Sequence, residues 1–357
     1  MPARRIRIAV AGLGRIGWDF HALGLSRHRD FELVAVADTL PDRRSQAEQV
    51  LGCRTYADFA EMIRQGGLEA VVVATPTHLH RKLAVAALRL GLHVLLEKPM
   101  ATSYRQAAAI ARAAREAGRV LTVYQPLRLD AAFQHLLRVV RSGRIGPVFW
   151  AQRGMWNYVR RNDWQSLRRF GGGMLNNYGA HGLDQLLQIV GYDVRRVLCQ
   201  MQLVASLGDA DDVVKVVFET RQGALAQLDV NQASAVRPYE LIVWGTRGAV
   251  ELKGRELLVR RFDLRRLPPS KLNPALASTG RRYPHDDIPW EEQTTPVDER
   301  WGIDVFADLA RAIRRGAPPA VRPEETLAVM RLIDRCRASA GRIRRIARSR
   351  GEHSDLL

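Results

Sequence analysis

The sequence predicts an α/β fold with an N-terminal doubly wound domain and a C-terminal α+β domain built on a large, mostly antiparallel open sheet. Three observations favour this fold. Short apolar strands alternate with helical segments over residues 1–123, and a glycine-rich turn follows the first strand. From about residue 124 the strand segments follow one another without intervening helices. Alternation of strands and helices is typical of parallel βαβ units, whereas turn-linked strands favour antiparallel pairing.

The first domain is predicted from five strands and the helices between them. Each strand is a short run of β-branched and apolar residues, and the segments between them are rich in alanine and leucine. We expect strands at 5–10, 31–37, 70–74, 93–96 and 120–123, and helices from Pro41 and near 79–90 and 103–117. Right-handed crossovers join such strands into one parallel sheet covered on both faces.

The second domain is predicted at residues 124–345, followed by a frayed tail at 346–357. We expect helices near 130–142, 181–190, 302–315 and 323–340, and strands at 147–154, 196–205, 212–219, 223–232, 239–244 and 249–252. Residues 265–300 are rich in proline and polar residues and predict a long loop. A sheet with one open face favours a homodimer or homotetramer.

Composition narrows the class of protein. The net charge is +18, but only five of the 55 basic residues are lysine, and the arginines are spread along the chain. Nucleic-acid proteins usually gather their basic residues on one face beside a reading module, and none is visible. The three cysteines form no CxxC pair, which favours a reducing cytoplasm. No apolar stretch reaches the length of about 18 residues needed to span a bilayer, and the early strand leaves no room for a signal peptide.

A nucleotide-binding turn follows the first predicted strand. The GxGxxG pattern opens a helix, and an acidic residue, Asp38, ends the next strand. This context is typical of the Rossmann dinucleotide fingerprint, in which the backbone cradles the pyrophosphate at a helix N-terminus. The residues of the turn are Gly12, Leu13, Gly14, Arg15, Ile16 and Gly17.

Asp38 also bears on the choice of dinucleotide. A carboxylate at this position accepts hydrogen bonds from a free ribose 2′-hydroxyl and repels a 2′-phosphate. Arg43 and Arg44 follow closely and offer an alternative partner for such a phosphate, although they also suit a solvated helix face. The sequence therefore favours NAD over NADP.

Two further motifs make the chain resemble the Gfo/Idh/MocA oxidoreductase family. The first runs from Ala74-Thr75-Pro76-Thr77-His78-Leu79-His80 to Leu96-Glu97-Lys98-Pro99, and the second is Gly171-Gly172-Gly173-Met174-Leu175-Asn176-Asn177-Tyr178-Gly179-Ala180-His181. The resemblance covers nearly the whole chain and implies an enzyme that transfers hydride between a nicotinamide and an alcohol carbon. It implies cofactor contacts from Thr75, Pro76, His80, Glu97 and Lys98.

Lys98 is singled out by its chemistry as well. The chain uses arginine at most basic positions, yet it has lysine at the end of a predicted parallel strand, where α/β sheets bind ligands. Lysine shifts its pKa readily when buried, whereas arginine stays protonated. The resemblance implies that Lys98 contacts the nicotinamide ribose and the substrate hydroxyl, and we expect Pro99 to shape the turn, with a cis bond as one option.

His181 is the expected acid/base, at the start of a helix after the glycine turn. The family pattern usually has aspartate four residues earlier, where this chain has Asn177. An amide can orient a hydroxyl or an imidazole but carries no charge. Lys98 and His181 are therefore expected to handle the proton between them, and Asn177 to orient.

No metal site is expected, because His78 and His80 do not face one another on a helix and no cluster completes a site. Trp156, Tyr158 and Trp164 suit a substrate wall and loop packing equally. The leading hypothesis is an NAD-dependent dehydrogenase of a sugar, inositol or related polyol. A glycosidase that retains NAD and a non-catalytic NAD-binding sensor are the alternatives.

Overall fold

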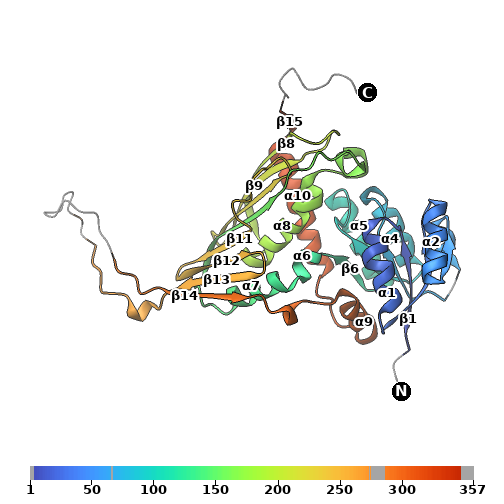
Figure 1. Ribbon diagram of the computed structural model, residues 1–357, viewed down its shortest axis with the longest axis horizontal. Coiled ribbons are helices and arrows are strands. Elements are labelled where there is room, and N and C mark those ends of the chain that lie inside the picture. Colours follow the sequence, from blue (N-terminus) through green and yellow to red (C-terminus); the bar gives the residue numbers. More distant parts are fainter. Residues whose placement is uncertain (1–3, 66, 273, 275–285, 347–357) are drawn as a thin grey trace.

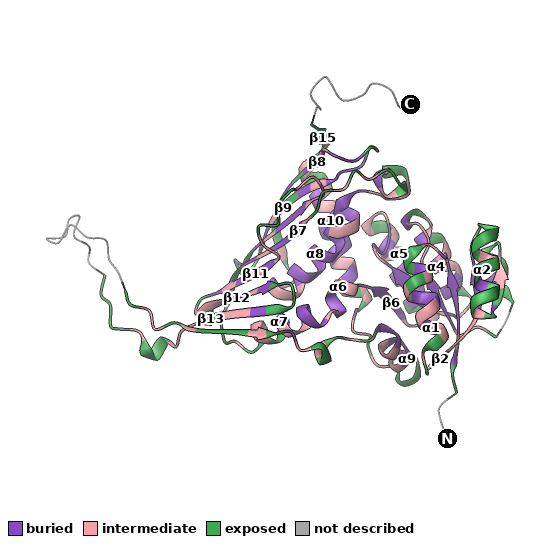
Figure 2. Cartoon of the chain, in the orientation of Figure 1, coloured by how far each residue is buried: buried purple, intermediate pink, exposed green. Residues whose placement is uncertain are grey.

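The computed structural model describes residues 4–65, 67–272, 274 and 286–346. Two sheets organise the chain, and helices α8 and α10 lie between the larger sheet and the first domain (Figure 1). The buried residues concentrate in the first sheet and along α8, as Figure 2 shows. In the described part of the chain, no helix combines the length and the apolar character required to cross a membrane.

The first sheet has six parallel strands in the order β3-β2-β1-β4-β5-β6. Its strands are β1 (Ile6–Ala11), β2 (Phe31–Ala37), β3 (Arg54–Tyr56), β4 (Ala70–Val73), β5 (His93–Glu97) and β6 (Leu121–Tyr124). All five predicted strands are confirmed. Strand β3 was not predicted, because its three residues at the sheet edge contain no apolar run.

Helices cover both faces of this sheet, which explains why the central strand β4 is buried along its whole length. They are the π-helical segment η1 (Gly17–Ala22), which continues into α1 (Leu23–Arg27), and then α2 (Pro41–Leu51), α3 (Phe59–Arg64), η2 (Thr77–Leu79), α4 (His80–Arg89) and α5 (Tyr104–Ala117). Helix α5 shows clear end signals. The Ser103 side chain accepts a hydrogen bond from the N–H of Gln106, and Gly118 ends the helix in the left-handed region.

The second sheet has nine strands in the order β14-β13-β12-β11-β7-β10-β9-β8-β15. They are β7 (Val148–Trp156), β8 (Val194–Leu203), β9 (Val213–Thr220), β10 (Leu225–Asn231), β11 (Leu241–Gly245), β12 (Gly248–Lys253), β13 (Glu256–Arg261), β14 (Glu291–Pro296) and β15 (Ile343–Arg345). The six predicted strands are confirmed. The sheet is mixed, because β7 pairs with β10, and β8 with β15, in parallel.

The helices of the second domain are α6 (Pro126–Leu129), α7 (Ala131–Arg141), α8 (Met174–Val190), α9 (Val305–Arg315) and α10 (Pro323–Ala340), with short turns η3 (Trp164–Ser166), η4 (Arg168–Phe170), η5 (Leu264–Arg266) and η6 (Glu299–Trp301). Of these helices, α7, α8 and α10 pack on the sheet. The predicted boundary at residue 123 assigns α9 to the second domain. This helix returns to the first domain, where Phe306 stacks on Phe20 with ring centroids 5.3 Å apart.

Three local expectations are wrong. Helix α8 begins at Met174 rather than near residue 181, so His181 lies two turns inside it. The segment 265–300, a predicted loop, contains β14, a polar edge strand held by its ladder to β13. The end of the second domain, where no strand was expected, forms β15 at Ile343–Arg345. In the two strands, long-range pairing overrides weak local propensity.

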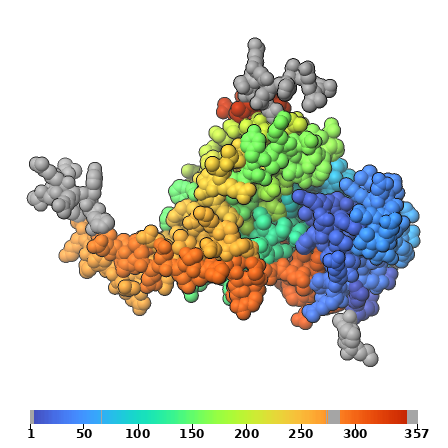
Figure 3. Space-filling view, in the orientation of Figure 1, coloured from blue at the N-terminus to red at the C-terminus, as the bar shows by residue number. Residues whose placement is uncertain are grey.

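Two parts of these expectations fall outside the described residues. They are residues 273 and 275–285 of the predicted loop and residues 347–357 of the predicted tail. The described residues on either side of the first gap, 264–272 and 286–290, extend away from the body of the second domain (Figure 3).

Candidate active site

The glycine turn after β1 has the shape that close backbone approach requires. Gly12 has φ +92°, and a Cβ there would lie 2.6 Å from the carbonyl oxygen of Ala74. A Cβ on Gly17 would overlap the carbonyl oxygen of Gly12, so the helix can approach the turn only because residue 17 has no side chain. No atom lies within 4 Å of a Cβ built on Gly14. The turn therefore packs tightly on its inner side and is open on the side where a pyrophosphate would lie.

Asp38 is held beside this turn at the end of β2. Its carboxylate accepts hydrogen bonds from the N–H groups of Leu13 (2.7 Å) and Leu40 (2.9 Å) and lies 3.2 Å from Nη1 of Arg43. Arg44 donates to the backbone carbonyls of Asp38 and Thr39. The carboxylate thus sits where the Rossmann fingerprint predicts a ribose contact, and one of the two arginines is already paired with it.

His80 is buried and joins two loops of the site. Its Nδ1 lies 2.9 Å from the carbonyl oxygen of Pro99, and its Nε2 lies 2.8 Å from that of Thr75. The pKa of His80 is lowered, mainly because the imidazole is buried. The Lys98–Pro99 bond is cis. His80 therefore connects the Thr75 and Lys98 loops, a positioning contact that sequence reasoning did not foresee.

Glu97 turns into the protein. Its Oε1 lies 2.7 Å from Nε2 of the fully buried His21, and its Oε2 accepts a hydrogen bond from the N–H of Lys98 at 3.2 Å. Both carboxylate oxygens therefore have partners within the protein. The Glu97 carboxylate therefore lies between His21 and the backbone of Lys98 and faces the protein interior.

Lys98 lies directly after β5, and its ammonium contacts an amide. Nζ donates to Oδ1 of Asn177 at 2.7 Å. Burial lowers the pKa of Lys98 to about 8, Glu97 opposes this shift, and the charges of Arg15 and Arg161 add to it. The side chain is therefore a proton donor or acceptor near neutral pH, which arginine could not be.

His181 lies one helical turn after Asn177, on the same face of α8. It is buried, and its Nδ1 lies 2.8 Å from Oε1 of Gln125. An amide oxygen accepts only, so Nδ1 carries the proton and Nε2 has the free lone pair. Burial, followed by the charges of Lys98 and Arg153, lowers the pKa of His181 well below its usual value. The imidazole is thus neutral at pH 7 and able to accept a proton at Nε2.

Two glutamines were missed by the sequence analysis. Gln125 directly follows β6, and its place at the carboxyl edge of a parallel sheet was an available signal. Gln165 lies in η3, and its Oε1 accepts hydrogen bonds from Nδ2 of Asn177 (2.9 Å) and Nη1 of Arg161 (2.5 Å). No local pattern marks Gln165, because only the fold brings η3 beside α8.

The triple glycine sets the start of α8. A Cβ on Gly173, which has φ +104°, would collide with the carboxylate of Asp211. That carboxylate accepts a hydrogen bond from the N–H of Leu175 at 2.7 Å. A Cβ on Gly172 would overlap the carbonyl oxygen of Gln165. The glycines let η3 and the loop of Asp211 pack against the first turn of α8, which carries Asn177 to Lys98.

The aromatic and histidine candidates near this region differ in whether they are packed or exposed. Trp156 donates its Nε1–H to the carbonyl oxygen of Tyr239 at 2.7 Å and is a packing residue. Tyr158 and Trp164 are exposed, which leaves them available to a ligand. His78 is exposed beside the Phe170 ring. Among the described residues, no group of three or more histidine, cysteine or acidic side chains is arranged to hold a metal ion.

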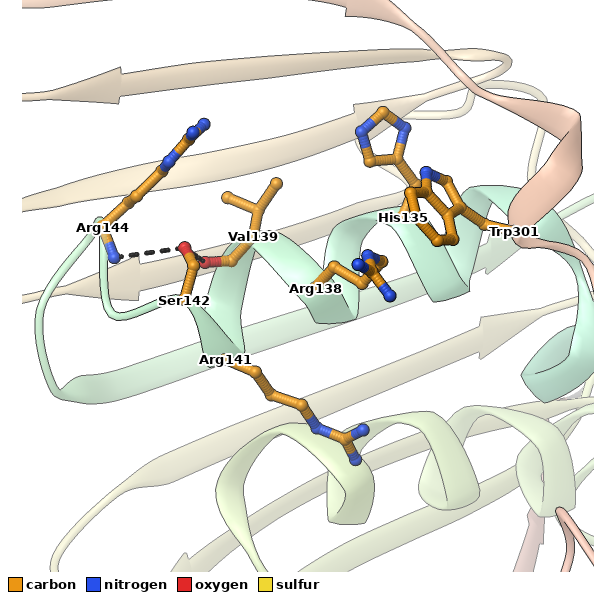
Figure 4. A pocket seen from close by; sticks show the side chains of 7 residues that line it. All are labelled: His135, Arg138, Val139, Arg141, Ser142, Arg144 and Trp301. Carbon is orange, nitrogen blue, oxygen red and sulfur yellow. Dashed lines mark hydrogen bonds between the residues drawn. The ribbon is translucent and has the colours of Figure 1, made fainter.

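A separate hollow of about 500 Å³ lies on α7 and does not belong to this site. Figure 4 shows its lining, in which Arg138 lies against the ring of Trp301 at 3.6 Å from the ring centroid. Arg141 also lines it and donates to Gln188. None of the residues that contact Lys98 or His181 lines this hollow.

The fold and this site define a class of protein: an NAD(P)-binding oxidoreductase with a lysine and a histidine at the carboxyl edge of a Rossmann sheet. Residues 6–125 match the family described as "Oxidoreductase family, NAD-binding Rossmann fold". Residues 133–251 match the "GFO/IDH/MocA C-terminal domain". The chain belongs to the Gfo/Idh/MocA oxidoreductase family.

The relatives of this chain are named for different reactions and substrates. The chain is 28% identical over 256 residues to myo-inositol 2-dehydrogenase of Thermotoga maritima, covering 69% of this chain and 74% of that protein. It is 25% identical over 258 residues to 2,7-anhydro-N-acetylneuraminate hydratase of Escherichia coli, covering 70% and 68%. The WlbA dehydrogenase of Bordetella pertussis, solved with NADH and UDP-GlcNAcA, has a similar fold, with a TM-score of 0.75 at 23% identity and coverage of 95% and 97%.

Proposed function

We propose that this chain is an NAD-dependent dehydrogenase that transfers hydride between the nicotinamide and a secondary alcohol carbon of a sugar, inositol or related polyol. The observation that carries this proposal is the contact of the Lys98 ammonium with Asn177, one helical turn from His181. The three side chains form one polar group at the carboxyl edge of the sheet. Relatives named for inositol oxidation support the choice of substrate class.

Each side chain has a distinct role in the proposed reaction. Bound NAD supplies the hydride acceptor for alcohol oxidation. Nε2 of His181 takes the hydroxyl proton as the carbonyl forms, while Gln125 holds the ring through Nδ1. The Lys98 ammonium donates a hydrogen bond to the substrate oxygen and stabilises its negative charge. Asn177 orients the lysine, and its amide cannot itself take a proton.

The residues present fit a dinucleotide. The open side of Gly14 and the free N–H groups of the helix that follows suit the pyrophosphate, and Asp38 suits the ribose hydroxyls. We propose NAD rather than NADP, because a carboxylate repels a 2′-phosphate. The proposed cofactor contacts are Gly12, Leu13, Gly14, Arg15, Ile16, Gly17, Asp38, Thr75, Pro76, His80, Glu97 and Lys98.

A second candidate is a reaction in which NAD is retained and no net oxidation occurs. It is favoured by two relatives that are named hydratases rather than dehydrogenases, each 25% identical to this chain. The same groups would serve a transient oxidation and its reversal. The two candidates differ in whether NADH leaves the enzyme.

A screen of the purified protein against inositols and aldoses, followed by NADH absorbance, tests the proposal. We expect turnover with NAD and at least one polyol, and loss of that turnover in a His181→Ala variant. Release of bound NAD on denaturation, combined with no net reduction by any polyol, would instead support the retained-cofactor reaction.

The outer face of the second sheet is proposed to pair with a second copy of the chain. Trp150 and Trp244 lie on it with ring centroids 6.0 Å apart, and Leu198 is 64% exposed. Apolar side chains of this size on an open sheet face are typical of subunit interfaces. Light scattering on the purified protein should give the mass of a dimer or tetramer, and Trp150→Glu should reduce it.

A further inference from the structure

Positive side chains from three separate elements converge on the candidate site. Lys98 comes from the end of β5, Arg153 from β7 and Arg161 from the loop before η3. Relatives are named for neutral and for acidic sugars alike, so they do not choose between these substrates. The charges around the site offer an independent criterion.

Arg153 lies on the inner face of the large sheet, toward His181. Its register partner on β10 is Leu228, and a Cβ on Gly182 would collide with the Leu228 side chain, so this face packs directly on α8 beside His181. Arg153 is 7% exposed, and its Nη1 donates to the backbone oxygen of Glu240 at 2.9 Å. Its Nε is buried, with no hydrogen-bond partner among the described residues. A buried guanidinium with an unused N–H favours the arrival of an acceptor.

Arg128 provides a comparison within the same chain. Arg128 and Arg153 are the buried arginines in the described part of the protein. Arg128 forms ion pairs with the carboxylates of Asp184 and Glu325. Arg153 has one ion pair, with the Glu240 carboxylate at 3.6 Å, and that side chain is 38% exposed. The charge of Asp130 also acts on Arg153, although Asp130 is itself paired with Arg255. The arginine in the structural cluster thus has two close carboxylate partners, whereas the arginine facing the site has one longer and partly exposed ion pair.

Arg161 is connected to Lys98 through side chains. It donates to Gln165, whose Oε1 also accepts from Asn177, and Asn177 accepts from Lys98. Arg161 also pairs with Asp163 at 2.9 Å, but its Nε is buried and has no hydrogen-bond partner in the described structure. The loop therefore adds a second guanidinium with an unused N–H to the polar group around the lysine.

The acidic side chains nearby are used elsewhere. Glu97 pairs with His21, and Asp211 accepts from the N–H of Leu175. Within the described residues, no carboxylate accepts a hydrogen bond from the Lys98 ammonium, whose partner is the neutral amide of Asn177. Glu97 acts on the Lys98 ammonium through its charge without contacting it, so the ammonium and the unused N–H groups of Arg153 and Arg161 remain open to an acceptor.

We infer that the substrate is an anionic sugar or polyol, whose carboxylate or phosphate is bound by Arg153 and Arg161 while Lys98 and His181 act on its hydroxyl group. This inference rests on the proposed dehydrogenase function and narrows its substrate class. The guanidinium fork can donate two parallel hydrogen bonds to a carboxylate or to a phosphate, and such charge-assisted hydrogen bonds are the strong ones. The chain-wide excess of arginine does not account for Arg153, because that excess lies on solvated surfaces and Arg153 is buried.

Calorimetry on the NAD-loaded protein tests this inference without requiring turnover. The probes are D-glucose as the neutral reference, with D-glucuronate and glucose 6-phosphate as matched anions that differ from it at one carbon, and D-gluconate. We expect at least one anion to bind about 10- to 100-fold more tightly than glucose, which is the range of a charge-assisted hydrogen bond. The pattern among the three anions then separates carboxylate from phosphate recognition.

Three variants locate the preference. Arg153→Met and Arg161→Met should each reduce the advantage of the anion over glucose, and Arg153→Lys should retain part of it. Arg112→Gln removes a charge from α5 at an exposed position and should leave the advantage unchanged. Thermal melts of all variants check folding.

Two results overturn the inference: none of the anions binds more tightly than glucose, or Arg112→Gln reduces the advantage as much as both site variants do. Failure of the proposed function looks different. In that case the anion preference is measured as expected, but no probe supports reduction of NAD.

Discussion

Replacing Asn177 with aspartate tests how Lys98 and His181 share the proton. The substituted carboxylate would lie at the position of Oδ1, 2.7 Å from the lysine Nζ. At about 3 Å and an effective dielectric constant of about 20, two unit charges attract by about 5 kcal/mol, an upper limit because the carboxylate must also lose water. Opposite charges in contact usually shift a pKa by about one to three units.

The sign of the shift follows from the charge. A carboxylate favours the ammonium, so the pKa of Lys98 should rise from about 8. It favours the imidazolium as well, so the depressed pKa of His181 should rise too. Alcohol oxidation needs the deprotonated base, and the rate should therefore reach its plateau at a higher pH in Asn177→Asp, by about one to three pH units.

The assay is kcat/KM for oxidation of the identified substrate, measured by NADH absorbance across a pH series. Asn176→Asp is the matched control, because its side chain accepts from Arg337 rather than from Lys98. The control should leave the profile in place. An unchanged or acid-shifted profile in Asn177→Asp would refute the coupling of these side chains in the reaction.

Four further outcomes follow from the same contacts. Lys98→Arg should lower kcat/KM by at least about 10²-fold, since a guanidinium cannot give up its proton. The variant should keep the fold and the NAD affinity, which thermal melting and calorimetry check. Retention of a tenth of the activity would contradict this prediction. Gln125→Leu should remove the acceptor that fixes the His181 ring, and kcat should fall more than KM changes. Asp38→Ala should narrow the gap between NAD and NADP affinity, and tighter NADP binding by the unmodified protein would overturn the assignment. Arg128→Met leaves the buried Asp184 carboxylate without its partner, while Glu325 keeps Arg322, and should cost about 3–5 kcal/mol in chemical denaturation.

Much of the site was predictable because its signals are local. Gly12 and Gly17 are required by the close approach of the backbone within a single turn, so their spacing marks the nucleotide site in the sequence itself. Lys98 follows a strand that is recognisable from its apolar run, and the position of a residue after such a strand determines which edge of the sheet it occupies. Asn177 and His181 were recognised from the family motif, but their common helical face became clear only from the structure, in which α8 begins at Met174.

The tertiary structure decided which partner each of these residues has. Gln165 and Arg153 reach the site from segments whose sequence patterns give no sign of it, and Glu97 turns inward to a histidine far away in the chain. The edge strand β14 exists through its ladder to β13 rather than through any apolar alternation of its own. Periodicity, glycine spacing and strand-end position are properties of neighbouring residues, so the sequence alone determined the nucleotide turn, the parallel character of the first sheet and the place of Lys98 at the end of a strand. Hydrogen-bond partners and the charge balance around Lys98 depend on which faces meet across the fold, and that is decided only when the two sheets pack on the helices between them.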